Sequence, residues 1–128
     1  MAEMSNYLED ALINATLRNT SYTSPATIYV ALYTTDPTDA DTGTEVAGNG
    51  YVRQSVAFGA PSNGVTSNSA AVEFPQATGS WGTVAYIGLR DASSGGNLLY
   101  HTALDTSKTI STGDVLRLAI GSLTVTLT

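Results

Sequence analysis

Residues 27–34 read Thr27-Ile28-Tyr29-Val30-Ala31-Leu32-Tyr33-Thr34, and this stretch decides the fold class. It consists almost entirely of β-branched, aromatic and aliphatic residues, which favour an extended strand. Along it, Ile28, Val30 and Leu32 alternate with Tyr29, Ala31 and Tyr33, so both faces of the strand are apolar. Because an apolar face must be covered, we expect this strand to lie centrally in a sheet that is packed on both sides.

Six more short segments of similar character follow, and turn residues separate them. They are residues 51–58, 70–74, 83–90, 98–103, 115–120 and 123–127. In the segment 83–90, strict alternation places Val84 on the face opposite Ile87 and Leu89. Seven short strands predict a mainly β fold, namely an antiparallel β-sandwich of jelly-roll or immunoglobulin-like type.

One helix is predicted, ahead of the strands, over residues 5–19. Ser5 is a good N-cap, and Leu8 and Leu12 recur with Ala11 and Ala15 at helical spacing. This apolar stripe either covers a face or edge of the sheet, most naturally the second face of strand 27–34, or docks on a neighbouring subunit. Leu8 and Leu12 are therefore candidate interface residues.

The composition predicts one domain over residues 1–128, with few charges on its surface. Only 12% of the residues are charged, the net charge is −6 and cysteine is absent. A weakly charged surface favours contacts between subunits, whereas five scattered basic residues argue against direct nucleic-acid binding. No long apolar run or signal peptide is visible, so we expect no membrane association and assembly in the cytosol.

The longest irregular stretch, residues 35–50, holds four of the eleven carboxylates of the chain. Asp36, Asp39, Asp41 and Glu45 are weak candidates for a calcium site, but their spacing differs from that of an EF-hand. The alternative is a solvated loop in which Asp36 caps the turn before Pro37. A loop of this length also suits contact with a neighbour, which makes Asp36, Pro37, Asp39, Asp41 and Glu45 candidate interface residues.

Groups suited to catalysis are scarce in this sequence. His101 is the only histidine, and no nucleophile-elbow spacing accompanies it. We therefore expect no enzymatic activity, no catalytic residue and no cofactor. Exposed aromatic residues could instead form a sugar-binding platform, as in a carbohydrate-binding module. The candidates for such a platform are Tyr29, Tyr33, Tyr51, Trp81, Tyr86 and Tyr100.

Several segments together resemble a family of small phage virion proteins, whose members are often labelled tail fiber protein. These segments lie at residues 7–18, 24–33, 35–39, 43–46, 50–54, 96–101 and 108–114, so the likeness covers nearly the whole chain. Similar small β-domains serve as capsid cement or decoration proteins. The resemblance implies a non-enzymatic bacteriophage structural protein that is assembled in the host cytoplasm and located in the virion.

Within that class, our leading hypothesis is a capsid cement protein. It would bind and stabilise the shell of major capsid protein, most naturally as a homotrimer at threefold positions. The alternative is a tail or tail-fiber component that contacts the host surface. The partners would be copies of the chain together with the major capsid protein or another virion protein.

Overall fold

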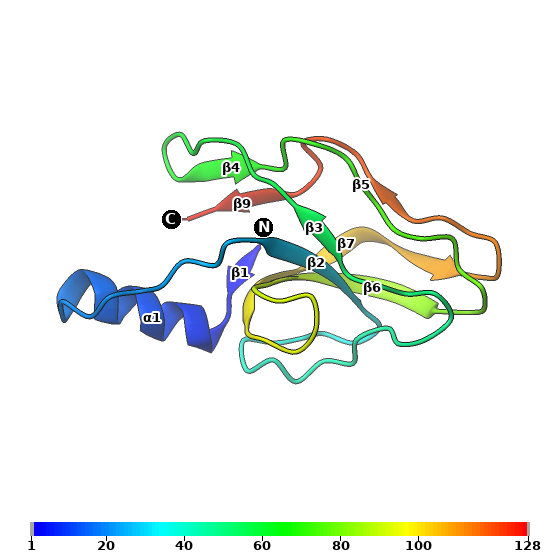
Figure 1. The fold of residues 1–128 in the computed structure, drawn as a ribbon, viewed down its shortest axis with the longest axis horizontal. Helices are drawn as coiled ribbons and strands as arrows, with labels where there is room; N and C mark the ends of the chain where they lie inside the picture. Colours follow the sequence, from blue (N-terminus) through cyan, green and yellow to red (C-terminus); the bar gives the residue numbers. More distant parts are fainter. Residues whose placement is uncertain (1, 128) are drawn as a thin grey trace.

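The structure is a computed structural model that describes residues 2–127, and within this range it contains one helix and nine strands. The helix, α1 (Asn6–Leu17), follows the first strand directly. Five strands form one antiparallel sheet in the order β1-β7-β6-β2-β3 (Figure 1). Their bounds are β1 (Glu3–Met4), β7 (Leu98–Ile110), β6 (Gly82–Arg90), β2 (Ile28–Tyr33) and β3 (Gln54–Val56).

Four shorter strands pair two by two outside this sheet. They are β4 (Val65–Ser67) with β9 (Thr124–Thr126), and β5 (Val72–Glu73) with β8 (Arg117–Leu118). The prediction of a mainly β, antiparallel fold with one N-terminal helix is thus confirmed. The jelly-roll or immunoglobulin-like sandwich stays a prediction, because the strands outside the main sheet form two separate pairs.

The main core lies between one face of the five-stranded sheet and the segments that carry the two strand pairs. Val30 and Leu32 contribute to it from β2, and Phe74 and Trp81 from the chain between β5 and β6. The opposite face of β2 is equally buried, since Ala31 and Tyr33 have exposed fractions of 0% and 1%. The expectation of a strand covered on both faces is therefore confirmed.

The expectation that the helix covers the second face of β2 is wrong. On that face Asp41 of loop 35–50 pairs with Arg90, which also donates to the hydroxyl of the buried Tyr33. At the edge of β2 the loop pairs with the backbone, since Tyr33 bridges to Glu45 and Val46 donates a hydrogen bond to the carbonyl of Leu32. The helix contacts β7 and extends past the edge of the sheet (Figure 1). The loop is thus part of the domain's own packing.

The pairing of β6 with β7 shifts register between Val84 and Tyr86, since Val84 pairs with Lys108 and Tyr86 pairs with Ala103. Two steps along β6 thus face five steps along β7, and the regular alternation of side chains is interrupted at this point. Val84 consequently joins Ile87 and Leu89 in the main core, where strict alternation had placed it on the opposite face.

Two strands, β1 and β4, were not expected, and β7 runs seven residues beyond the segment 98–103, to Ile110. In this extension, Asp105, Thr106, Ser107, Lys108 and Thr109 are all exposed. A strand with polar side chains on both faces lacks the apolar alternation that marks a half-buried strand. β1 and β4 contain only two and three residues, too few for a period to be visible.

Ser5 caps α1 as predicted, since its side chain accepts a hydrogen bond from the Leu8 amide at 3.2 Å. The same hydroxyl donates to the carbonyl of Leu98 in β7, and the Asn6 amide donates to the carbonyl of Asp39. The start of the helix is thus fixed to both the sheet and the loop. Among the described residues, no helix is sufficiently long and apolar to span a membrane.

Candidate functional site

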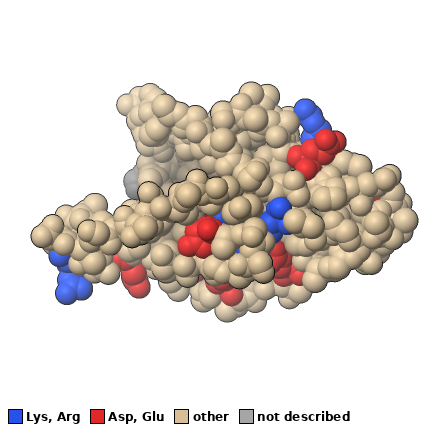
Figure 2. Space-filling model, viewed as in Figure 1, with Lys and Arg blue, Asp and Glu red and all other residues tan. Residues whose placement is uncertain are grey.

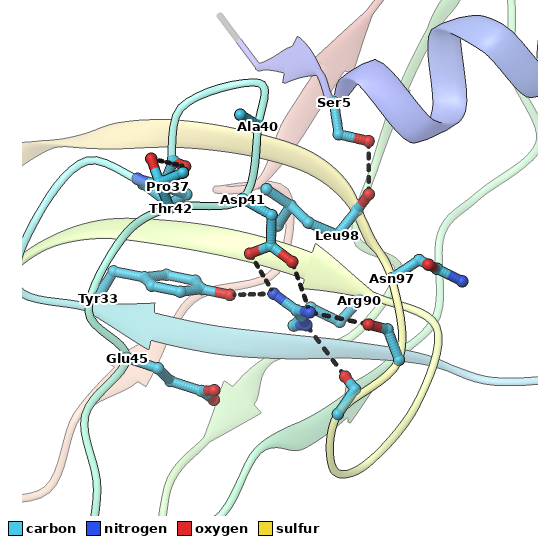
Figure 3. A network of polar contacts seen from close by, with 12 residues as sticks. Ser5, Tyr33, Pro37, Ala40, Asp41, Thr42, Glu45, Arg90, Asn97 and Leu98 are labelled. Carbon is cyan, nitrogen blue, oxygen red and sulfur yellow. Dashed lines mark hydrogen bonds and ion pairs between the residues drawn. The ribbon is translucent and has the colours of Figure 1, made fainter.

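Arg90, at the end of β6, holds the loop of residues 35–50 against the sheet (Figure 3). Its two terminal nitrogens contact the two oxygens of Asp41 at 2.7 and 2.8 Å, and Nη1 also donates to the Tyr33 hydroxyl at 2.9 Å. The Arg90 side chain is 8% exposed. Burial lowers the pKa of Arg90, but the hydrogen bonds to Asp41 and Tyr33 outweigh burial and raise it above its ordinary value. The guanidinium is therefore a permanent structural cation.

Arg53 makes a second bidentate pair, with Glu45. Its Nε and Nη2 atoms lie 2.7 and 2.8 Å from the two carboxylate oxygens of Glu45. Nη1 donates to the carbonyls of Ala92 and Gly95, and Gly95 also accepts a hydrogen bond from Arg90. The two arginines thus join loop 35–50 to the turn after β6.

Glu45 also accepts a hydrogen bond from the Tyr51 hydroxyl at 2.6 Å. Burial raises the pKa of Glu45, but the hydrogen bonds from Arg53 and Tyr51 outweigh burial and hold it below its ordinary value. In the folded chain this carboxylate is therefore stabilised in its ionised form.

The lowered pKa of Glu45 predicts acid-dependent stability. A depressed pKa contributes stability that is present above the ordinary value of 4.5 and is lost as the pH falls through the folded pKa. Between about pH 5 and 3, the melting temperature of the native chain should fall more steeply than that of Glu45→Gln. Melting curves across this range test the prediction. Glu73→Gln is the control: Glu73 is exposed on β5, so this variant should show the same dependence of melting temperature on pH as the native chain. An equal fall in melting temperature with pH for the native chain and Glu45→Gln would contradict the prediction.

His101, on β7, lies among carboxylates. Its Nε2 atom is 2.7 Å from Asp39 Oδ1, and its Nδ1 atom is 3.9 Å from Asp36 Oδ1. Glu3 of β1 is its direct partner across the strand pair. Both ring nitrogens face acidic side chains, so neither is directed at a serine as a Ser-His-Asp triad requires.

The structure therefore splits the four acidic candidates of loop 35–50. Asp41 and Glu45 pair with Arg90 and Arg53, while Asp36 and Asp39 face His101. It does not bring the four together as ligands of one calcium ion. Asp36 caps its turn, because its carboxylate accepts a hydrogen bond from the Thr38 amide at 2.9 Å.

The aromatic residues do not gather into an exposed platform. Tyr51 packs against Phe74 and Trp81 with ring centroids 6.2 and 5.5 Å away, and Trp81 is 4% exposed. Tyr33 lies buried under Arg90. These three rings stabilise the core and the loop, and the other three candidates, Tyr29, Tyr86 and Tyr100, are half-buried.

The most exposed apolar surface of the domain lies on α1. Tyr7, Ile13 and Leu17 are 42%, 53% and 80% exposed, and they are three of the eight large hydrophobic residues exposed among residues 2–127. Leu8 is 4% exposed and so packs inside the chain, while Leu12 is half-buried. Of the remaining interface candidates, Pro37 is fully buried.

Sequence reasoning missed Arg53, Arg90, Ile13 and Leu17. The two arginines form their pairs across 8 and 49 positions of the chain, and no local pattern signals such distances. For Ile13 and Leu17 a signal was present, because they lie four residues apart on the side of the helix away from Leu8 and Leu12. Apolar residues on two sides of one helix indicate two different contacts.

The visible face of the domain carries few charged side chains, as the composition predicted (Figure 2).

A protein-family model described as podophage GP4 fiber I protein gp80 matches residues 3–126. No curated protein matches the chain.

Proposed function

The chain belongs to the podophage GP4 fiber I protein gp80 family, and we propose that it works as a self-associating, non-enzymatic building block of the fiber. The family makes it a phage virion structural protein and a fiber component. This identity favours the fiber alternative over the capsid cement hypothesis. Attachment to the host surface is the role that we propose for the fiber that contains it.

The observation that carries the proposed self-association is the exposed row on α1. Ile13 and Leu17 form this row, four residues apart on a helix that projects from the sheet (Figure 1), whereas Tyr7 lies on another side of the helix. Exposed apolar patches of monomeric proteins are small, and contiguous ones mark contact sites. The domain does not cover this row itself.

We propose that a second copy of the chain covers it. Glu9 and Asp10 lie near the start of α1 and Arg18 caps its end, so the helix is acidic at one end and basic at the other. A second α1 that runs antiparallel would bring Arg18 beside the acidic end of its partner and join the two apolar rows. Such a two-fold contact is self-complementary, as contacts in closed homo-oligomers require.

The antiparallel contact predicts a dimer as the smallest assembly. The homotrimer expected in the sequence analysis was part of the capsid cement hypothesis, in which it would occupy threefold positions of the shell. It stays a prediction. The mass of the isolated oligomer, measured by sedimentation, distinguishes a dimer from a trimer.

Phage particles that lack this protein test the proposed role in the fiber. We expect them to keep their DNA on heating as well as complete particles do but to adsorb to host cells at least about 10-fold more slowly, because binding through many copies loses strength steeply with each lost contact. Restoring the protein from a plasmid is the control. Normal adsorption combined with early loss of DNA would contradict the fiber role and support capsid cement.

A further inference from the structure

We propose that Glu3, Asp39 and His101 form a binding site for one divalent transition-metal ion, and Zn²⁺ is the ion with which to test it. Each of the three side chains offers one ligand atom, and these atoms all lie within 4.8 Å of one another. This inference is independent of the role in the fiber.

The three residues come from three separate segments that the fold holds together. Glu3 of β1 lies directly opposite His101 of β7 in the antiparallel pair, so the two side chains share one face of the sheet. Asp39 belongs to loop 35–50, and its carbonyl accepts a hydrogen bond from the Asn6 amide at 2.8 Å. His101 is 6% exposed, whereas Glu3 is exposed, so the site is closed on the side of the sheet and open to ions from solvent.

The charges around His101 do not balance. Three carboxylates, those of Glu3, Asp36 and Asp39, surround one imidazole. Across residues 2–127 none of the three makes an ion pair with a lysine or an arginine, since Arg53 and Arg90 are engaged by Glu45 and Asp41. A bound divalent cation would neutralise this excess of negative charge.

The kinds of ligand favour a transition metal over calcium. Imidazole nitrogen suits Zn²⁺ and its neighbours in the first transition row, whereas Ca²⁺ prefers oxygen ligands alone. Tetrahedral ligands at about 2.0 Å from zinc lie roughly 3.3 Å from each other. The 2.7 Å contact between His101 Nε2 and Asp39 must therefore widen slightly when the metal binds, and Glu3 starts within 4.8 Å of both ligand atoms. The metal then takes the place of any proton on Nε2, and the neutral ring carries its one proton on Nδ1, gained through solvent where Nδ1 lacked it.

Asp36 has a positioning role in this arrangement. Its carboxylate lies 3.9 Å from His101 Nδ1, on the side of the ring away from Asp39. Histidine ligands of metals usually direct their second nitrogen at a carboxylate or carbonyl, which fixes the tautomer and the ring orientation. A bound ion would join β1 and loop 35–50 to β7, immediately before α1 begins at Asn6.

Zinc binding to the full chain, made without a histidine tag and freed of metal by chelation, tests the proposal. Calorimetry should give one Zn²⁺ per chain, and Zn²⁺ at about 100 times its dissociation constant should raise the melting temperature by roughly 5–10 °C. Co²⁺ should produce the visible absorption of a coordinated ion. Ca²⁺ and Mg²⁺ at the same concentration should leave the melting temperature unchanged.

Two variants identify the ligands. Glu3→Gln and Asp39→Asn keep the size of each side chain and should each weaken zinc binding by at least about 10-fold. Glu73→Gln, which removes an exposed carboxylate outside the cluster, should bind zinc as the native chain does. Absence of saturable binding, an equal response to Ca²⁺, or equal affinities of Glu3→Gln and Glu73→Gln would each overturn the proposal.

Discussion

Replacement of Arg90 by alanine is expected to lower the free energy of unfolding by about 3 kcal/mol. The Arg90 side chain is 8% exposed and contacts Asp41, Tyr33 and the carbonyls of Gly95 and Gly96. Its removal leaves the Asp41 carboxylate without its cation and takes the Arg90 hydrogen bond from the Tyr33 hydroxyl within a buried face. Because Asp41 is 36% exposed and gains some solvation, the loss lies at the lower end of the range for a broken buried ion pair.

Urea denaturation of Arg90→Ala and of the native chain measures this loss. Arg117→Ala is the matched control, because Arg117 is exposed on β8 and its removal should change stability by less than about 0.5 kcal/mol. Arg90→Lys should recover only part of the loss, since an ammonium cannot make the bidentate contact. Equal stabilities of Arg90→Ala and Arg117→Ala would show that loop 35–50 does not depend on this ion pair.

Replacement of both Ile13 and Leu17 by glutamate is expected to weaken self-association by at least about 30-fold while the domain stays folded. The two side chains are 53% and 80% exposed in the single chain, so charges there cost the fold little. In the proposed antiparallel contact they would place four carboxylates inside an apolar interface. Burying unpaired charge is strongly unfavourable, and the assembly should dissociate.

Sedimentation across a range of concentrations measures the dissociation constant of the variant. Val115→Glu with Ile120→Glu is the control, since these residues are 47% and 66% exposed elsewhere on the surface. That control should associate as the native chain does, and both variants should melt near the native temperature. A native chain that remains monomeric at high concentration, or equal losses in the two variants, would contradict the contact through α1.

The parts of the fold that the sequence predicted are those with a local physical signal. In β2, apolar residues on both faces predicted a strand buried on both sides, and Val30, Ala31 and Leu32 are all 0% exposed. Ser5 combines the residue type of an N-cap with the right position before an apolar period, and it caps α1. Such signals arise within a few residues, so a single sequence contains them.

The remaining features depend on residues far apart in the chain. Val84 shares the core with Ile87 and Leu89, although strict alternation separates them, because the register of β6 against β7 shifts between Val84 and Tyr86. The partners of Asp41 and Asp39 lie 49 and 62 residues away. Clustering in sequence suggested one calcium site, and the fold instead distributes the four carboxylates between two arginines and a histidine.

The location of the protein on intact phage tests the fiber role most directly. Purified particles decorated with a Fab fragment against this chain, imaged by electron microscopy, should carry the Fab on their fibers and leave the capsid faces bare. Fab density repeated over the capsid shell, with fibers unlabelled, would contradict the role in the fiber and return the chain to the class of capsid cement proteins.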